Sequence, residues 1–171
     1  CGCADESMLH MVTCSRVGRL WATCFRFCTS VLGETGADLN VEDAIIFNVD
    51  RGGKPLKEPT RAFLRHAVRW WYADLTHVNE TAGAIFMWEA TFCKALEGFR
   101  SAVLRHARTI RLHHTHRAYT NLQGVVPESE RARFTSLVQI REDGSYQLTA
   151  AFTKAVDDAR AEYDRRRQQQ G

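Results

Sequence analysis

The sequence of 171 residues has no long uncharged apolar segment, and this absence excludes a membrane-spanning helix. The longest such run, Ala82 to Trp88, is far shorter than the ~20 residues that cross a bilayer. Proline and glycine are scarce, with 3 and 11 residues, which excludes a collagen-like or linker-dominated chain. The apolar share of 44% and the charged share of 25% are ordinary for a folded protein. We therefore expect a globular chain that does not interact with membranes.

Motifs of catalysis are also lacking. The sequence contains no complete phosphate-binding loop, no Gly-x-Ser-x-Gly elbow, no His-Glu-x-x-His helix and no dinucleotide fingerprint. Gly52-Gly53-Lys54 is only a fragment of a phosphate loop and indicates a turn. Cys93 has no local signature of a catalytic nucleophile. We expect that the protein is not an enzyme and needs no cofactor.

The cysteines favour buried thiols over disulfides or metal ligands. They are Cys1, Cys3, Cys14, Cys24, Cys28 and Cys93. Cys24 and Cys28 are four residues apart in a helical pattern, where free cysteine packs as a small hydrophobe. No second close pair of cysteines accompanies Cys1 and Cys3 at zinc-site spacing. A reducing, intracellular setting follows as the expectation.

Apolar periodicity predicts a mainly α fold, in which residues 1–171 form a single domain of about five helices. Apolar residues recur at helical spacing over Asp5–Leu32, over Pro59–His77 and in a third helix that Asn79 is expected to cap. Residues 40–49 fit either the start of a short helix or a strand, of which we favour a strand or a mixed segment. Asp50–Pro55 predicts an exposed turn or hairpin tip.

The C-terminal part of the sequence gives weaker signals. A small β-hairpin about Asp143-Gly144 is expected, with a last helix from Thr149. We place the core at about residues 5–120, and a C-terminal arm or subdomain at about 121–171, with extended arms at the termini.

Arginine is distributed unevenly, although the net charge is only +3. No acidic residue lies between Glu97 and Glu128, a stretch that is rich in arginine and histidine. One arginine stripe falls on the second predicted helix and another on the third, each opposite the apolar face. The candidate nucleic-acid-binding residues are Arg61, Arg65, Arg69, Arg100, Arg108 and Arg111.

These arginines suit a phosphate backbone, because guanidinium groups keep their charge and present a planar fork of donors to phosphate oxygens. Nearby aromatic residues offer rings on which bases stack. The candidates are Trp70, Trp71, Tyr72 and Tyr119, of which Trp71 lies on the apolar face and is expected in the core. The alternative interpretation is that the arginines form solvated helix faces.

A histidine cluster is the weak candidate for a metal site. His113 and His116 are three residues apart with His114 between them, a spacing that suits zinc or copper if a thiolate or carboxylate joins them. The favoured interpretation is a partly charged end of an arginine-rich helix.

Three segments resemble the coat proteins of flexible filamentous plant viruses. They are Leu20–Cys28, Thr60–Phe63 with Val68–Tyr72, and Asn121–Arg131. The family's Phe-Ala-x-x-Asp-Phe block has no counterpart here. The resemblance implies a structural RNA-binding protein that self-assembles helically around single-stranded RNA, in the virion or the host cytoplasm. It also implies that Arg61 lies near the RNA channel.

Two other functions stay open at this point. One is a helical protein–protein interaction or regulatory module that does not bind nucleic acid. The other is a metal-binding protein that uses the His113–His116 cluster with cysteines.

Overall fold

The computed structural model describes residues 7–34, 39–120 and 133–170, with the backbone alone for residues 8, 111–120 and 170. The helices and strands follow one another as α1 (Met8–Thr13), α2 (Gly18–Ser30), the π-helix η1 (Glu42–Phe47), α3 (Glu58–Glu80), α4 (Trp88–Thr120), the 3₁₀ turn η2 (Thr135–Leu137), β1 (Val138–Ile140), β2 (Tyr146–Leu148) and α6 (Ala150–Gln170). The predicted mainly α fold with a small β-hairpin is confirmed.

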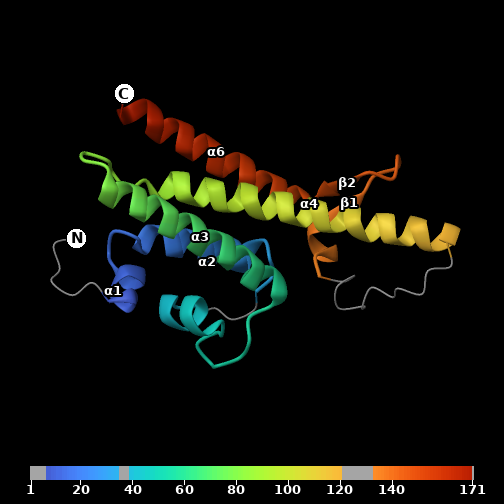
Figure 1. Cartoon of the computed structure of the whole chain (residues 1–171), viewed down its shortest axis with the longest axis horizontal. Helices are drawn as coiled ribbons and strands as arrows, with labels where there is room; N and C mark the ends of the chain where they lie inside the picture. The colour runs from blue at the N-terminus through green and yellow to red at the C-terminus, as the bar shows by residue number, and fades with distance from the viewer. Residues whose placement is uncertain (1–6, 35–38, 121–132, 171) are drawn as a thin grey trace.

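Helix α4 is the centre of the structure. It contacts α2, α3, α6 and the hairpin (Figure 1). Phenylalanine rings from these helices meet in the core, where the ring of Phe99 lies 5.7 Å from that of Phe63 and 5.5 Å from that of Phe152. Since aromatic pairs add to the hydrophobic effect of burial, this cluster joins α3, α4 and α6 into one core.

The predicted helix over Asp5–Leu32 is wrong as a single helix, because the chain turns between α1 and α2. The amide of Val17 donates to the carbonyl of Cys14 at 3.0 Å, and Cys14 itself is extended. Val12 and Val17 are both buried in the core. Five residues apart on an ideal helix they would point about 140° apart. The turn therefore brings both side chains to the same core.

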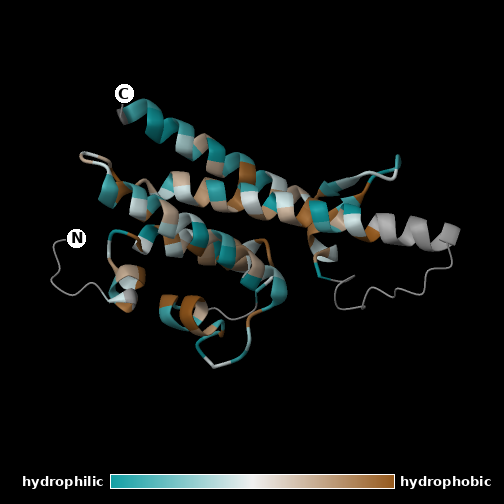
Figure 2. Ribbon diagram, in the orientation of Figure 1, coloured by the Kyte–Doolittle hydropathy of each residue, from teal (hydrophilic) through white to brown (hydrophobic). Residues whose placement is uncertain are grey.

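The strand favoured for residues 40–49 is also wrong. Helix η1 begins after Asn40, whose side chain accepts a 2.8 Å hydrogen bond from the amide of Asp43, and ends at Asn48 in the left-handed conformation (φ 57°). Figure 2 shows η1 largely in brown, the colour of hydrophobic residues. The turn predicted for Asp50–Pro55 is confirmed by the bridge between Val49 and Pro55.

Asn79 does not cap the third predicted helix. It lies in the last turn of α3, which continues to Glu80, and α4 begins only at Trp88. The connection between them contains Gly83 at φ 80°, a conformation that favours glycine.

Residues 133–170, which belong to the predicted C-terminal arm or subdomain, pack on α4. The hairpin predicted about Asp143-Gly144 is confirmed, with Val138 paired to Leu148 and Ile140 to Tyr146. Helix α6 then runs along α4 (Figure 1), and Phe152 is fully buried between them. An apolar stripe that continues through Val156 and Ala159 makes this helix part of the core.

No helix among the described residues is long and apolar enough to cross a membrane.

Candidate nucleic-acid interface

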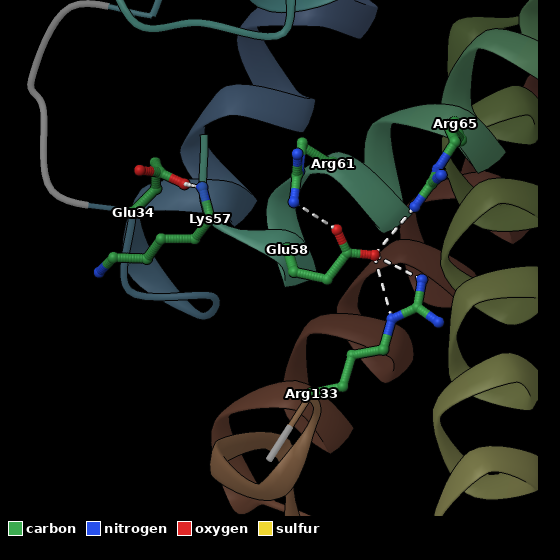
Figure 3. A network of polar contacts seen from close by, with 6 residues as sticks. All are labelled: Glu34, Lys57, Glu58, Arg61, Arg65 and Arg133. Atoms are coloured by element: carbon green, nitrogen blue, oxygen red, sulfur yellow. Dashed lines mark hydrogen bonds and ion pairs between the residues drawn. The ribbon is translucent and has the colours of Figure 1, made fainter. Parts of the chain in front are cut away.

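Helix α3 is anchored at its N-terminus by the end of α2. The backbone amide of Lys57 donates a 3.0 Å hydrogen bond to the buried carboxylate of Glu34 (Figure 3). The Lys57 ammonium donates to the carbonyl of Gly33. At the other end, Asp74 accepts hydrogen bonds from Thr91 at 2.7 Å and from Lys94 at 2.6 Å. These contacts fix the position of α3 relative to α2 and α4.

A groove of about 550 Å³ runs along the α3–α4 junction, and we call it the basic groove. Its lining residues are Ala62, Arg65, His66, Arg69, Ala102, Arg105, His106, Thr109, Arg133 and Phe134. Four arginines and two histidines face this space, and no carboxylate is among the described residues that line it. The groove therefore concentrates positive charge, which attracts anions.

The groove arginines differ in how their charge is compensated. Arg69 and Arg105 are exposed, and neither forms an ion pair with any described carboxylate. Arg65 and Arg133 both bind Glu58, although the Arg65 side chain is still 63% exposed. Two of the four guanidinium groups are thus available to a ligand without breaking an ion pair to a described carboxylate.

Glu58 is the acidic partner of three arginines at the start of α3 (Figure 3). Its carboxylate lies 2.8 Å from Arg61 Nη2 and 3.0 Å from Arg65 Nη2. Arg133 donates to it from Nε at 3.0 Å and also from Nη2. Partial burial alone would raise the pKa of Glu58, but the hydrogen bond from Arg133 and the three positive charges lower it overall.

The bond to Glu58 also positions the wall of the groove formed by residues 133 and 134. The Arg133 guanidinium lies 5.2 Å from the centre of the Phe134 ring, and that ring meets His106 of α4 edge-on at 5.3 Å. Phe134 itself is buried against Phe99. The C-terminal part of the chain thereby closes one side of the groove.

His66 lies at the α3–α4 contact, where Gly98 makes room for it. A Cβ atom at Gly98 would lie 2.9 Å from His66 Nδ1, closer than such atoms approach in proteins. Burial lowers the pKa of His66, and the charges of Arg69, Arg105 and Arg65 lower it further. Helix α4 continues through Gly98.

A second groove of about 480 Å³ lies between η1 and α3. Arg65 and Arg69 line both grooves, while Ala44, Ile45 and Leu64 give the second groove an apolar floor. Arg65 and Arg69 of α3 therefore lie between the basic groove and the second groove.

The six predicted arginines do not lie together. Arg65 and Arg69 line the basic groove, and Arg61 lines only the second groove. Arg100 pairs with Glu97 at 3.5 Å, and Arg108 is exposed but lies outside both grooves. The side chain of Arg111 lies outside the described residues.

Sequence reasoning missed His66, Arg105, His106 and Arg133. The arginines chosen on the third predicted helix lie opposite its apolar face, and Arg100 and Arg108 line neither groove. A groove between two packed helices is lined instead by residues at the edge of the apolar face, such as Arg105. No local sequence pattern predicts the place of Arg133, because that place depends on its tertiary contact with Glu58 at the start of α3.

At the contact between α4 and α6, arginines are paired with carboxylates, unlike Arg69 and Arg105 in the basic groove. Arg160 of α6 forms an ion pair with Glu97, and Arg166 Nε lies 3.1 Å from the buried carboxylate of Glu89. The arginines of this contact are therefore compensated by carboxylates of α4.

The aromatic candidates for base stacking are split between core and surface. Trp71 is buried against Trp21, as expected. Tyr72 is 60% exposed, and Lys94 lies over the ring of Trp70 at 5.5 Å. The side chain of Tyr119 lies outside the described residues.

The expected buried thiols are found at Cys24 and Cys28, and burial raises the pKa of both. The four cysteines that the structure describes are free. No group of metal-ligating side chains lies together among the described residues. His113, His114 and His116, like Cys1 and Cys3, have side chains outside that part of the chain.

Comparison of the chain with protein-family models, curated proteins and solved structures found no match. The functional proposal is therefore drawn from the geometry and charge of the basic groove.

Proposed function

We propose that this protein binds single-stranded RNA through its phosphates in the basic groove, and coats the RNA by self-association. The observation that carries the proposal is the groove itself, in which four guanidinium groups face one space that no described carboxylate lines. Arginine presents paired donors that match phosphate oxygens, and its charge does not titrate near neutral pH. Contacts of this kind are independent of base sequence and depend strongly on salt.

Exposed aromatic and aliphatic residues support the other parts of the proposal. Tyr72 of α3 is exposed and offers a ring on which an unpaired base can stack. On the neighbouring helices α1 and η1, Leu9, Ile46 and Phe47 are exposed, with Phe47 60% accessible. Helices α1 and η1 contact each other, so these exposed apolar side chains are candidates for contacts between subunits.

The binding test compares Arg105→Glu with the matched control Arg160→Glu, by titrating fluorescent oligouridine of about 15 nucleotides, a length that spans several phosphates. Arg105 has no described ion-pair partner, whereas Arg160 is paired with Glu97. We expect Arg105→Glu to weaken binding at least about tenfold, or ~1.4 kcal/mol, without loss of stability. Arg160→Glu should lower stability and change binding little. Equal affinities of Arg105→Glu and the wild type would refute the assignment.

The self-association test uses Phe47→Ser and long RNA. Phe47 lies outside both grooves, so the variant should bind the short oligonucleotide as the wild type does. On long RNA, we expect the wild type to bind cooperatively and form particles visible by negative-stain electron microscopy, and Phe47→Ser to bind without cooperativity. Unchanged particles would show that this surface has no part in assembly.

The same exposed residues favour one alternative, a helical interaction module whose arginines only solubilise it. This module would sediment as a stable monomer or dimer. In that case the wild-type protein would bind oligouridine no more tightly than the Arg105→Glu variant does.

A further inference from the structure

The basic groove contains titratable side chains among its arginines. His66 lines it from α3, together with Arg65 and Arg69 of the same helix. From α4, Arg105 and His106 line the same space.

Arg133 faces the groove from the third side. The carboxylate associated with this group of charges is Glu58, which binds Arg65 and Arg133.

The imidazole of His66 is held in place by the helices. On one side it abuts Gly98, where an added Cβ would lie 2.9 Å from Nδ1, and the Phe99 ring lies 6.3 Å from it centre to centre. The ring is half-buried and is therefore a fixed part of the groove wall. A phosphate bound between Arg69 and Arg105 would lie in the field that these two residues impose on His66.

In the free protein the groove opposes protonation of His66. Burial and the charges of Arg69, Arg105 and Arg65 lower its pKa below the ordinary value of 6.5, so the ring is neutral at neutral pH. A bound phosphodiester removes much of this repulsion, because its negative charge neutralises the guanidinium groups. It also offers an acceptor to an imidazolium N–H.

We propose that His66 binds the phosphodiester as an imidazolium, so that occupation of the basic groove is coupled to the uptake of one proton. This inference rests on the proposed function and adds a ligand and a pH dependence to it. The sign of the pH dependence follows from linkage. Because the bound state holds one more proton, RNA affinity rises as the pH falls, and this gain is lost as the pH rises. Within the window between the titrations of free and bound His66, affinity changes by up to about tenfold per pH unit.

The test uses oligouridine without a terminal phosphate, since neither a phosphodiester nor uracil titrates in the range of histidine. Affinity is measured at constant ionic strength between about pH 5 and pH 8, where an ordinary histidine changes charge. The wild type should bind more tightly at low pH. His66→Gln, which keeps a polar side chain of similar size, should show a much shallower dependence. The control His77→Gln, at an exposed histidine of α3 outside both grooves, should keep the wild-type dependence.

Nuclear magnetic resonance of the wild-type protein gives a readout that does not depend on a variant. The ring protons of His66 report its pKa directly, and we expect that pKa to rise when oligouridine is added. An unchanged pKa on binding, or the same pH dependence in His66→Gln as in the wild type, would overturn the inference.

The outcomes separate this inference from the proposed function. Binding that is strong but independent of pH would leave the basic groove as the RNA site and remove the role of His66. Absence of binding at every pH would refute the proposed function, and the inference with it.

Discussion

The arginines at the α4–α6 contact and those at the α3–α4 groove lie in opposite electrostatic settings. Toward α6, Arg160 pairs with Glu97, and Arg166 pairs with the buried Glu89. Toward α3, Arg69 and Arg105 face the basic groove and have no ion-pair partner among the described residues. The two sides differ in whether carboxylates already pair with the arginines, and a count of arginines along a helix does not reveal this difference.

The largest effects are expected from Phe134→Ala and its counterpart Phe152→Ala. Both rings are buried against Phe99, at 5.8 Å and 5.5 Å, but Phe134 also supports Arg133 and His106 at the groove. Each truncation should lower the free energy of unfolding by about 3–5 kcal/mol, as measured by chemical denaturation. Per folded molecule, only Phe134→Ala should bind oligouridine more weakly. If Phe152→Ala lost the same affinity, the two sides would not be functionally distinct.

A smaller effect separates Glu58→Gln from Glu97→Gln. Each substitution removes the partner of several arginines, and each should destabilise the protein by about 1 kcal/mol, since the ion pairs are partly exposed. Glu58→Gln releases Arg65 and Arg133 into the groove and should raise RNA affinity by about twofold to fivefold. Glu97→Gln should leave that affinity unchanged. Weaker binding by Glu58→Gln would show that Glu58 chiefly positions the groove wall.

Glu58→Gln and the wild type should also differ in acid. The pKa of Glu58 is lowered from its ordinary value of 4.5, so its contribution to stability is present above that value and is lost as the pH falls through the folded-state pKa. Glu58→Gln should therefore lose less stability than the wild type when the pH is lowered through this range, as followed by thermal unfolding. An identical loss in both proteins would contradict the charge network at Glu58.

The smallest effect is on the salt dependence of binding. Each phosphate contact that is removed should reduce the slope of log affinity against log salt by about 0.7 for a single strand. Arg105→Gln should show this reduction between about 50 and 200 mM salt, while Arg160→Gln should keep the wild-type slope. Equal slopes for the two variants would place Arg105 outside the phosphate contacts.

The elements with strong periodicity could be predicted from the sequence. The apolar face of α3, with Phe63 and Trp71, and the hairpin about Asp143-Gly144 depend on local patterns, and both predictions are confirmed. The turn between α1 and α2 could not be predicted, because it depends on the burial of both Val12 and Val17 in a core assembled from distant helices.

The candidate site was only partly predictable for the same reason. The stripe of Arg65 and Arg69 follows from helical spacing, since residues four apart share a face. His66 and Arg133 enter the site through tertiary contacts. His66 depends on Gly98 of α4, and Arg133 depends on Glu58. No local pattern in the sequence contains them.

The most direct measurement of the central claim is a ¹⁵N spectrum of the arginine Nε–Hε groups during titration with oligouridine. If uncompensated groove arginines bind the phosphates, the signals of Arg69 and Arg105 should shift first and furthest. The signals of Arg160 and Arg166, held by carboxylates, should remain in place. Shifts confined to Arg160 and Arg166, or an unchanged spectrum at saturating oligouridine, would contradict the account.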